Sequence, residues 1–210
     1  GISISGADAA NYTANTSTTT TANITGKPLT VTGITGTNKV YDGTTAATLN
    51  SGSAALVGVL GNDKVTLNTG SATGTFADKN IGTSKTVSVS GLTISNTDAP
   101  NYTLVQPTTS ANITAKGLTV SGVTANNKLY DSTTAATLNT ASAALVGVVS
   151  GDSVTLDTAS ATGTFASPSV GTGKTFSVSG FTISGGDTGN YSLTQPTTTA
   201  DITGKTLTVS

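Results

Sequence analysis

Apolar residues alternate with threonine and serine along most of this chain, which is the period-two pattern of a half-buried β-strand. In LTVTG the side chains of Leu29 and Val31 point to one face, and in NYTLVQ those of Tyr102 and Leu104 share a face in the same way. Glycine, asparagine and aspartate interrupt these runs at regular intervals, as turns do. The pattern predicts an all-β domain of about seven or eight short strands.

The alternation changes phase once within each copy of the pattern, in the stretch TVSVSGLTIS. Val87 and Val89 share one parity and Leu92 shares the other, because Gly91 intervenes. A β-bulge at the glycine restores the inward face, and a turn at the same glycine does so equally well. Both interpretations stay open from the sequence.

The whole pattern repeats after 89 residues, so that Tyr41 corresponds to Tyr130. Roughly 65% of the paired positions are identical without a gap, which marks an internal repeat. The opening GISISGADAANYT resembles GLTISNTDAPNYT, and the closing LTVS resembles the start of a repeat. We expect the end of a preceding repeat at 1–26, complete repeats at 27–116 and 117–205, and the first strand of another at 206–210. The array is expected to continue in both directions.

This period is too long for the coil of a solenoid and fits small domains in series. Stretches such as ANITAKGLTV lead from the last strand of one repeat to the first strand of the next within two or three residues. A link this short leaves little hinge freedom. We therefore expect tandem Ig-like β-sandwich domains arranged end to end as a semi-rigid rod, with β-grasp-like domains as the alternative.

Composition narrows the possible chemistry. The 210 residues include ten acids, all aspartate, and nine bases, all lysine, with a net charge of −1 and no histidine or cysteine. This balance gives no electrostatic basis for binding nucleic acid, and no apolar run is long enough for membrane insertion. The usual zinc ligands and the nucleophiles that depend on histidine or cysteine are missing. We expect no enzymatic activity.

The stretch KVYDGTT at 39–45 is the most motif-like part of the chain, and it returns as KLYDSTT at 128–134. Its plainest interpretation is a tyrosine packed at the edge of the domain and an aspartate that caps a turn through nearby backbone groups. Ser132 stands where the first copy has Gly43. We therefore expect that this position does not require a left-handed backbone.

A sharper interpretation is an intramolecular isopeptide cross-link, in which a lysine is joined to an asparagine or aspartate with help from a buried carboxylic acid. Each repeat holds the residue types for such a bond, namely Lys39, Asp42 and Asn101 in the first and Lys128, Asp131 and Asn190 in the second. The intact protein would then be lighter by one ammonia or one water per repeat.

We predict no cofactor, no metal ligand and no catalytic residue. Calcium is the alternative to this expectation, because it stiffens many extracellular rods and binds through several oxygen ligands. The aspartates are scattered singly, at Asp42, Asp63, Asp98 and their copies, and form no D-x-D-x-D cluster. Binding of an extracellular polysaccharide or a host glycan is the alternative function, although the few aromatic residues mostly occupy core-like positions.

Several ordered segments resemble a known family, namely LTVTGITGTNKVYDGTTAAT, GTFADKNIGTSKTVSVSGLTIS and NYTLVQPTTSANIT. They are similar to the YDG-type repeats, related to the repeats called MBG, of very large bacterial surface proteins that include the filamentous-haemagglutinin-like adhesins. The resemblance covers essentially the whole chain. Ser132 interrupts the literal YDG tripeptide in the second copy and leaves the surrounding pattern intact.

The resemblance implies a secreted or cell-surface bacterial protein whose repeats form a stalk or fibre. We therefore expect a structural spacer of an adhesin or of a biofilm-matrix fibre, with a role in cell adhesion. Its expected partners are neighbouring repeats of the same chain, together with self-association into fibres or contact with extracellular polysaccharide. The resemblance carries over no catalytic residue.

Overall fold

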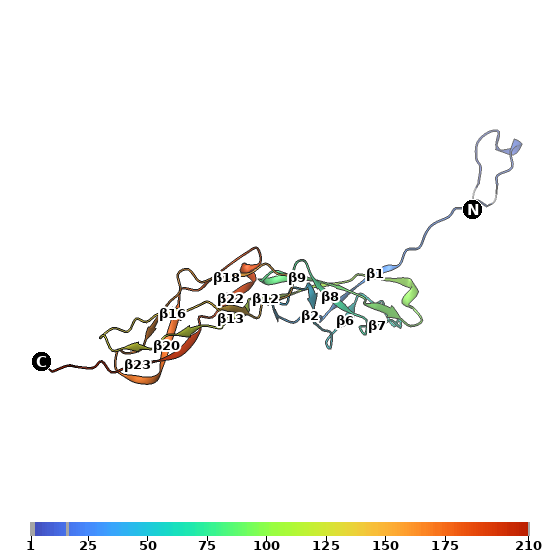
Figure 1. The fold of residues 1–210 in the computed structure, drawn as a ribbon. Coiled ribbons are helices and arrows are strands. Elements are labelled where there is room, and N and C mark those ends of the chain that lie inside the picture. Colours follow the sequence, from blue (N-terminus) through green and yellow to red (C-terminus); the bar gives the residue numbers. More distant parts are fainter. Residues whose placement is uncertain (1–2, 16, 210) are drawn as a thin grey trace.

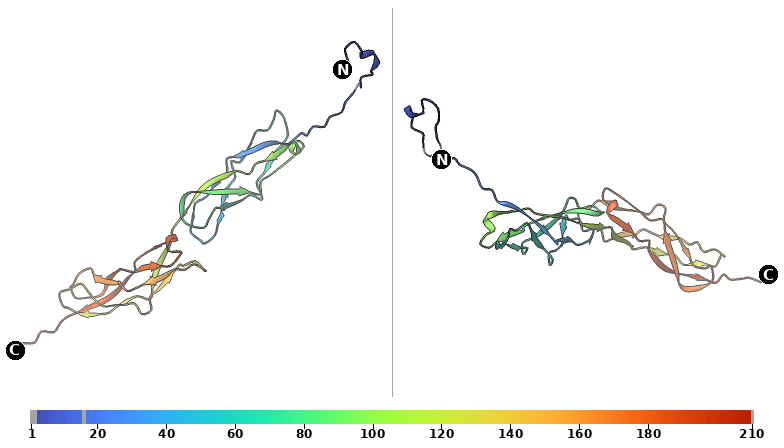
Figure 2. Two further views of the ribbon diagram at one scale, coloured as in Figure 1. Left: turned by 90° about the horizontal axis from the view of Figure 1, so that it is seen from above. Right: turned by 180° about the vertical axis from the view of Figure 1, so that it is seen from behind.

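Two β-rich domains lie end to end in the computed structural model, which describes residues 3–15 and 17–209 (Figure 1). Residues 1, 2, 16 and 210 fall in the partial repeats predicted at 1–26 and 206–210, and they lie outside the described residues. The two terminal segments leave from opposite ends of a long molecule, and this shape persists in two further views (Figure 2). The structure confirms the prediction of all-β repeats in tandem.

The first domain is built from short strands between residues 27 and 114, with one 3-10 helix, η2 (Ala99–Asn101). Its strands are β1 (Lys27–Thr32), β2 (Thr35–Gly36), β3 (Lys39–Val40), β4 (Ala46–Ala47), β5 (Leu49–Asn50), β6 (Ala55–Val57), β7 (Thr66–Asn68), β8 (Thr73–Phe76), β9 (Gly82–Ser90), β10 (Thr93–Ser95), β11 (Tyr102–Leu104) and β12 (Thr108–Thr114).

The second domain repeats this order between residues 116 and 203, with the 3-10 helix η3 (Thr188–Asn190). Its strands are β13 (Lys116–Ser121), β14 (Thr124–Ala125), β15 (Lys128–Leu129), β16 (Leu138–Asn139), β17 (Ala144–Val146), β18 (Thr155–Asp157), β19 (Thr162–Phe165), β20 (Gly171–Ser179), β21 (Thr182–Ser184), β22 (Tyr191–Leu193) and β23 (Thr197–Thr203). Ala115 alone separates β12 from β13.

Small curled sheets make up each domain, and they mix parallel with antiparallel pairs. In the first domain the orders are β3-β12-β9-β8-β4, β11-β1-β6, β10-β7 and β2-β5. In the second they are β15-β23-β20-β19, β17-β13-β22, β18-β21 and β14-β16. The strand that opens each domain, β1 or β13, pairs in parallel with the late strand β11 or β22. Its other neighbour is the earlier strand β6 or β17, so the first strand of a domain has both of its partners only when the last part of the domain has folded.

At Gly91, where the sequence left a bulge or a turn open, β9 ends and the chain passes on to β10. Gly91 has a left-handed φ of 79°, and it stands between β9 and β10, which pair with different strands. The side chain of Gln106 holds the segment between these two strands, because its amide oxygen accepts from the Leu92 N–H at 3.1 Å and its amide nitrogen donates to the Leu92 carbonyl at 2.9 Å.

A register irregularity lies elsewhere, in the pairing of β12 with β9, where the register shifts between Ala111 and Ile113. Ser84 sits opposite this shift with a φ of 49°, and its backbone N–H donates to the Asn112 side chain at 2.7 Å. The second domain has the same shift between Gly171 and Lys174. The sequence pattern gave no sign of this irregularity, because it falls among polar residues.

The buried apolar residues form three clusters along the long axis of the molecule. One lies within the first domain around Val89 and Leu92, and another lies within the second around Phe176 and Phe181. The middle cluster spans both domains: it joins Tyr41, Phe76, Val87, Ala111 and Ile113 to Leu118 and Tyr191. The hydrophobic core therefore continues through the junction.

The N-terminal segment before β1 holds a 3-10 helix, η1 (Ala9–Asn11), and is largely exposed in its described residues. Ile24, which corresponds to the buried Ile113 in the repeat pattern, is fully exposed. No helix in the described part of the chain is long and apolar enough to cross a membrane.

Candidate functional site at the junction between the domains

The KVYDGTT motif forms a tight turn at the end of the first domain that faces the second. Strand β3 runs parallel to β12, and the Tyr41 N–H donates to the Thr114 carbonyl at 2.8 Å. One carboxylate oxygen of Asp42 accepts from the Thr44 N–H and from the Thr44 hydroxyl, each at 2.9 Å. Asp131 makes the same bonds to Thr133. The prediction that the aspartate caps a turn is confirmed.

The expectation for position 132 is wrong. Ser132 has a φ of 67°, close to the 78° of Gly43, so both copies of the turn are left-handed at this residue. A left-handed backbone costs a residue with a Cβ roughly 1–2 kcal/mol relative to its usual conformation. The bonds that Asp131 makes to Thr133 hold the turn in this form despite the cost.

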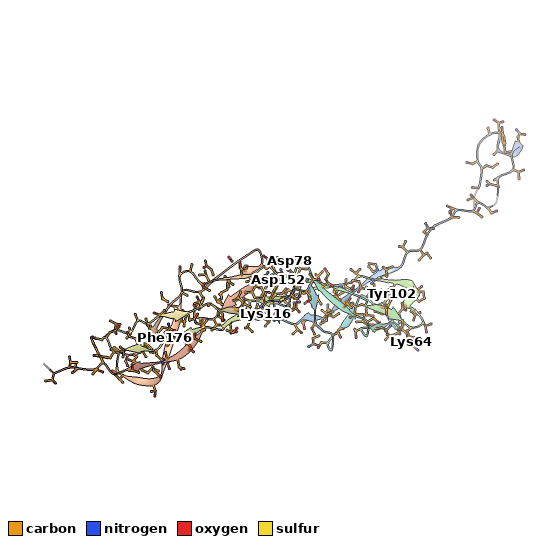
Figure 3. The ribbon with its side chains drawn as sticks, in the orientation of Figure 1. Lys64, Asp78, Tyr102, Lys116, Asp152 and Phe176 are labelled. Carbon is orange, nitrogen blue, oxygen red and sulfur yellow. The ribbon has the colours of Figure 1, made fainter. Side chains whose placement is uncertain are left out.

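Tyr41 is the residue of the motif that reaches the second domain. Its side chain is buried, with 1% of its surface exposed, and its hydroxyl donates to Oδ2 of Asp152 at 2.7 Å. Tyr191 donates to the same oxygen at 2.6 Å. The two tyrosine rings meet edge to face, with centroids 5.4 Å apart. Asp152 lies where the two domains meet (Figure 3).

Lys79 adds a positive charge from the loop that follows β8. Its ammonium group lies 2.9 Å from Oδ1 of Asp152 and 3.3 Å from Oδ1 of Asp187, so it bridges two carboxylates of the second domain. The same ammonium lies 5.8 Å from the centroid of the Tyr41 ring, within reach of a cation–π interaction. The Asp152 carboxylate, only 3% exposed, thus receives hydrogen bonds at both oxygens.

A neutral contact lies beside this ion pair. The side chain of Asn190 accepts from the Ile81 N–H at 3.0 Å and donates to the Asn80 side chain at 3.2 Å. Asn190 is buried, and its amide satisfies backbone and side-chain groups of the other domain. No buried side-chain nitrogen or oxygen lacks a partner in the described residues. The junction is therefore a packed and fully bonded interface.

The hydrogen bonds of the junction favour the ionised forms of its charged groups. The hydrogen bond from Tyr191, followed by that from Lys79, lowers the pKa of Asp152 from 3.8 to about 2. The hydrogen bond to Asp152 raises the pKa of Lys79. Burial, together with the bond to Asp152, raises the pKa of Tyr191 to about 12. The ion pair and both phenol donors therefore persist across the neutral range.

Two surfaces meet here, the tyrosine face of one domain and the aspartate face of the other. The tyrosine face of a domain comprises, in the first domain, Tyr41, Gly43, Lys79 and Ile81, and in the second Tyr130, Ser132, Pro168 and Val170. The aspartate face comprises, in the second domain, Val149, Asp152, Asp187, Asn190 and Tyr191, and in the first Leu60, Asp63, Asp98, Asn101 and Tyr102. The junction is the tyrosine face of the first domain on the aspartate face of the second.

The structure brings together only part of each predicted cross-link. Lys39 lies 2.8 Å from Asp42, and Lys128 lies 2.6 Å from Asp131. Asn101 lies in η2 on the aspartate face, directly before Tyr102, and Figure 3 shows Tyr102 at a distance from the junction, on the side of the N-terminal segment. Asn190 lies at the corresponding place in the second domain, in the junction.

Lys39 acts as a clip for its turn. Besides Asp42, its ammonium group donates to the carbonyl oxygens of Thr44 at 2.8 Å and Ala46 at 3.0 Å. Lys128 makes the corresponding bonds to Thr133 and Ala135. Through these bonds the ammonium hydrogens hold the turn of the motif closed. Tyr41 and Tyr130 therefore belong to the same rigid turn in the two domains.

The aspartates considered for calcium are each engaged within a turn or a face. Asp63 accepts from the Tyr102 hydroxyl at 2.6 Å, and Asp98 accepts from the Lys64 N–H at 2.8 Å. No group of three or more carboxylates that could hold a metal ion occurs among residues 3–15 and 17–209.

Sequence reasoning identified Tyr41 and missed the residues that it contacts. Tyr191 and Asp152 could have been found, because they recur after 89 residues as the copies of Tyr102 and Asp63. Lys79 offered no such signal, because Pro168 takes its place in the second repeat. A contact made once in the chain leaves no trace in a self-comparison.

Comparison with known proteins gives one result. A family model described as the YDG domain matches residues 25–111 and again residues 114–200. No curated protein and no solved structure matches the chain.

Proposed function

Because the chain belongs to the YDG domain family and carries two such domains in tandem, we propose that it is a structural spacer, a stalk segment of a bacterial surface adhesin or biofilm-matrix fibre. Its task is to hold a fixed distance and direction between the parts that precede and follow it. The proposed place of action is the outer cell surface or the extracellular matrix. The chain performs no reaction and needs no cofactor for this role.

The observation that carries the proposal is the junction. A flexible linker would leave the tyrosine face in water, whereas Tyr41 is buried against the second domain and donates to Asp152. Only Ala115 lies between the last strand of the first domain and the first strand of the second. A one-residue link, an ion pair and a shared apolar cluster together resist bending and twisting, and these are the properties a spacer needs.

Stiffness can be tested through the distance between spin labels on the two domains. The chain has no native cysteine, so single cysteines at Thr93 and Thr182 label specifically. Both are exposed and occupy the same position in their domains. A spacer with a fixed junction gives a narrow distance distribution in double electron–electron resonance.

The matched variant for this test is Tyr41→Ala, with Tyr130→Ala as its control. Removing Tyr41 is expected to broaden the distribution, and removing Tyr130 is expected to leave it narrow. A broad distribution in the unaltered junction would contradict the proposal. So would saturable binding of this chain to an extracellular polysaccharide, because that result favours the alternative of a glycan-binding module.

A further inference from the structure

The tyrosine faces of the two domains share a framework and differ in chemistry. The loop that follows β8 is held by Lys85, whose ammonium group lies 2.6 Å from the Asp78 carboxylate. The loop that follows β19 is held by Lys174, which donates to the Ser167 hydroxyl at 2.8 Å and to the Ser169 carbonyl at 2.7 Å. The corresponding lysine fixes the loop in both domains, so the two faces differ mainly in the side chains that they present.

Every residue of this loop is replaced between the domains. The first domain has DKNI at 78–81, and the second has SPSV at 167–170. The replacement removes both charges of the loop. One of them is the Lys79 ammonium, which lies 2.9 Å from Asp152 and 3.3 Å from Asp187 in the internal junction. The second domain thus has no cation at this place to offer to a facing pair of aspartates.

Two further differences weaken the same contact. Asn80 accepts from an amide of the facing domain at 3.2 Å, and a shorter serine takes its place in the second domain. Ser132 replaces Gly43, and a Cβ on Gly43 would lie 2.8 Å from Cγ1 of Val149, so that the facing side chain must shift. The tyrosine face of the second domain therefore fits an aspartate face of this form less tightly than that of the first domain does.

The tyrosine face of the second domain lies where the chain leaves that domain, because the Tyr130 N–H donates to the Thr203 carbonyl at 2.9 Å. The sequence that follows repeats the opening of a domain, with LTVS at 207–210 as at 118–121. We propose that this face meets the aspartate face of the next repeat of the same chain and forms a compliant joint, one that opens more readily than the internal junction. This inference rests on the proposed function, because it assigns different stiffness to two joints of one spacer.

The compliant joint keeps the tyrosine contact and loses the charged one. Tyr130 belongs to the same turn as Tyr41, held by Asp131 and Lys128, so its hydroxyl is placed to donate to a facing aspartate. Pro168 brings no charge to that aspartate. The spacer therefore bends first at joints of this kind, and the internal junction keeps its direction.

Amide hydrogen exchange measures how often the internal junction opens. The Ile81 N–H donates to Asn190, a buried side chain of the second domain, so its exchange reports the parting of this contact. The face variant gives the first domain the tyrosine face of the second, through Gly43→Ser and the loop SPSV at 78–81. The amide at position 81 should then exchange at least about tenfold faster, because hydrogen bonds to charged groups are lost.

Two more variants separate the charge from the shape of the face. Lys79→Ala removes the ammonium group alone and should account for most of the increase in exchange. The matched control makes the opposite change in the second domain, as Ser132→Gly/Pro168→Lys, and should leave the exchange of the Ile81 amide unaltered.

A chain lengthened by a copy of its own second domain tests the compliant joint itself. A copy of residues 116–210 is joined directly after Gly204, which corresponds to Ala115. Both joints then present the same aspartate face to different tyrosine faces. Segmental isotope labelling resolves the Val170 amide of the middle domain, the counterpart of Ile81. After correction for intrinsic rates it should exchange at least about tenfold faster than the Ile81 amide, and more slowly than in the unlengthened chain.

The outcomes distinguish the two proposals. Equal exchange of the Ile81 and Val170 amides in the lengthened chain overturns the compliant joint, as does unchanged exchange at position 81 in both the face variant and Lys79→Ala. Exchange of Val170 that the added domain does not slow overturns it too, because no joint has then formed. If the spin-label distribution across the internal junction is narrow in the unaltered chain, the spacer function stands while this inference fails. If that distribution is broad, the spacer function fails first.

Discussion

Tyr41 and Tyr130 occupy the same turn in their domains and differ in what lies above them. Tyr41 is buried by the second domain, and Tyr130 is exposed. Their local bonds are alike, so the difference comes from the neighbouring domain and not from the motif. The motif tyrosine is thus a contact residue, and it is buried only where the aspartate face of a neighbouring domain lies against it.

The substitution Tyr41→Phe should weaken the junction. It removes the hydroxyl that donates to Asp152 and keeps the ring in place, and a hydrogen bond to a charged group contributes about 1.5 kcal/mol or somewhat more. Denaturant unfolding monitored by circular dichroism should show a loss of that size. Tyr130→Phe is the matched control and should change the free energy of unfolding by less than about 0.5 kcal/mol. Equal losses in both variants would show that the junction bond adds nothing.

The junction should loosen in acid. The folded pKa of Asp152, about 2, lies below its ordinary value of 3.8, so the carboxylate stabilises the joint fully above pH 3.8. This contribution is lost as the pH falls from there through about 2. The spin-label distance distribution between positions 93 and 182 should broaden over that interval. In Asp152→Asn the distribution should be broad already at neutral pH and show no such transition. A wild-type distribution that stays narrow at pH 2 would contradict the assignment.

An alkaline limit follows from Tyr191. Its folded pKa of about 12 lies above the ordinary 10.0, so the phenol contributes fully below pH 10 and is lost as the pH rises through about 12. The pKa values of Tyr41 and Tyr102 are raised as well, so tyrosinate absorbance should show several late-titrating phenols, and Tyr191→Phe should remove one tyrosine's share of the late absorbance change. An identical titration curve in that variant would show that Tyr191 is not one of them.

At the scale of the strand, the two domains fill one equivalent core position with different residues. Phe176 in β20 takes the place of Val87 in β9, and its ring lies directly over Gly163 of β19. A Cβ at Gly163 would overlap that ring. The larger aromatic residue is accommodated because the facing strand has no side chain at this point.

The substitution Gly163→Ala should therefore destabilise the second domain by about 2–3 kcal/mol through overpacking. Gly189→Ala is the control, because a Cβ there meets nothing within 4 Å. Adding Phe176→Val, the residue of the first domain, should recover part of the loss. Thermal unfolding of the three variants checks the order. A loss in Gly163→Ala that Phe176→Val leaves untouched would point to the backbone as its cause.

The strands themselves could be predicted from alternation, and their partners could not. Leu29 and Val31 mark β1 correctly, and both are buried. The parallel pairing of Lys27 with Tyr102 joins residues far apart in the chain, and a period of two carries no information about direction. The short 3-10 helices also escaped notice, because three residues are too few to show helical spacing.

At the scale of the molecule, the 89-residue repeat predicted the tandem arrangement. It could not predict that the apolar core crosses from one domain to the next. Leu118 opens the second domain, yet it packs in the cluster that contains Phe76 and Ile113 of the first. Comparison of the two repeats treats them as equal units. It cannot reveal a side chain of one repeat that packs in the core of the other.

The substitution Leu118→Ala should accordingly weaken both domains. Loss of a fully buried leucine costs about 2–5 kcal/mol, and Leu118 has no exposed surface. Hydrogen exchange should show reduced protection in β12 as well as in β13. Leu29→Ala removes the equally buried counterpart in the first domain, and its effect should stay within that domain. Reduced protection confined to the second domain in Leu118→Ala would show that the shared cluster does not couple the two.

The parallel pairing of each opening strand has a mechanical consequence. Tension applied to the two ends of the molecule enters the first domain through β1 and leaves it through β12, which belong to different sheets. Ladder hydrogen bonds run roughly across the strands, so a pull along β1 loads its bonds to β11 and β6 in shear and all at once. The junction holds by the side chains around Asp152, by the shared apolar cluster and by Ala115. Under rising force the side-chain contacts of the junction should part before either domain unravels, and they can close again when the tension drops.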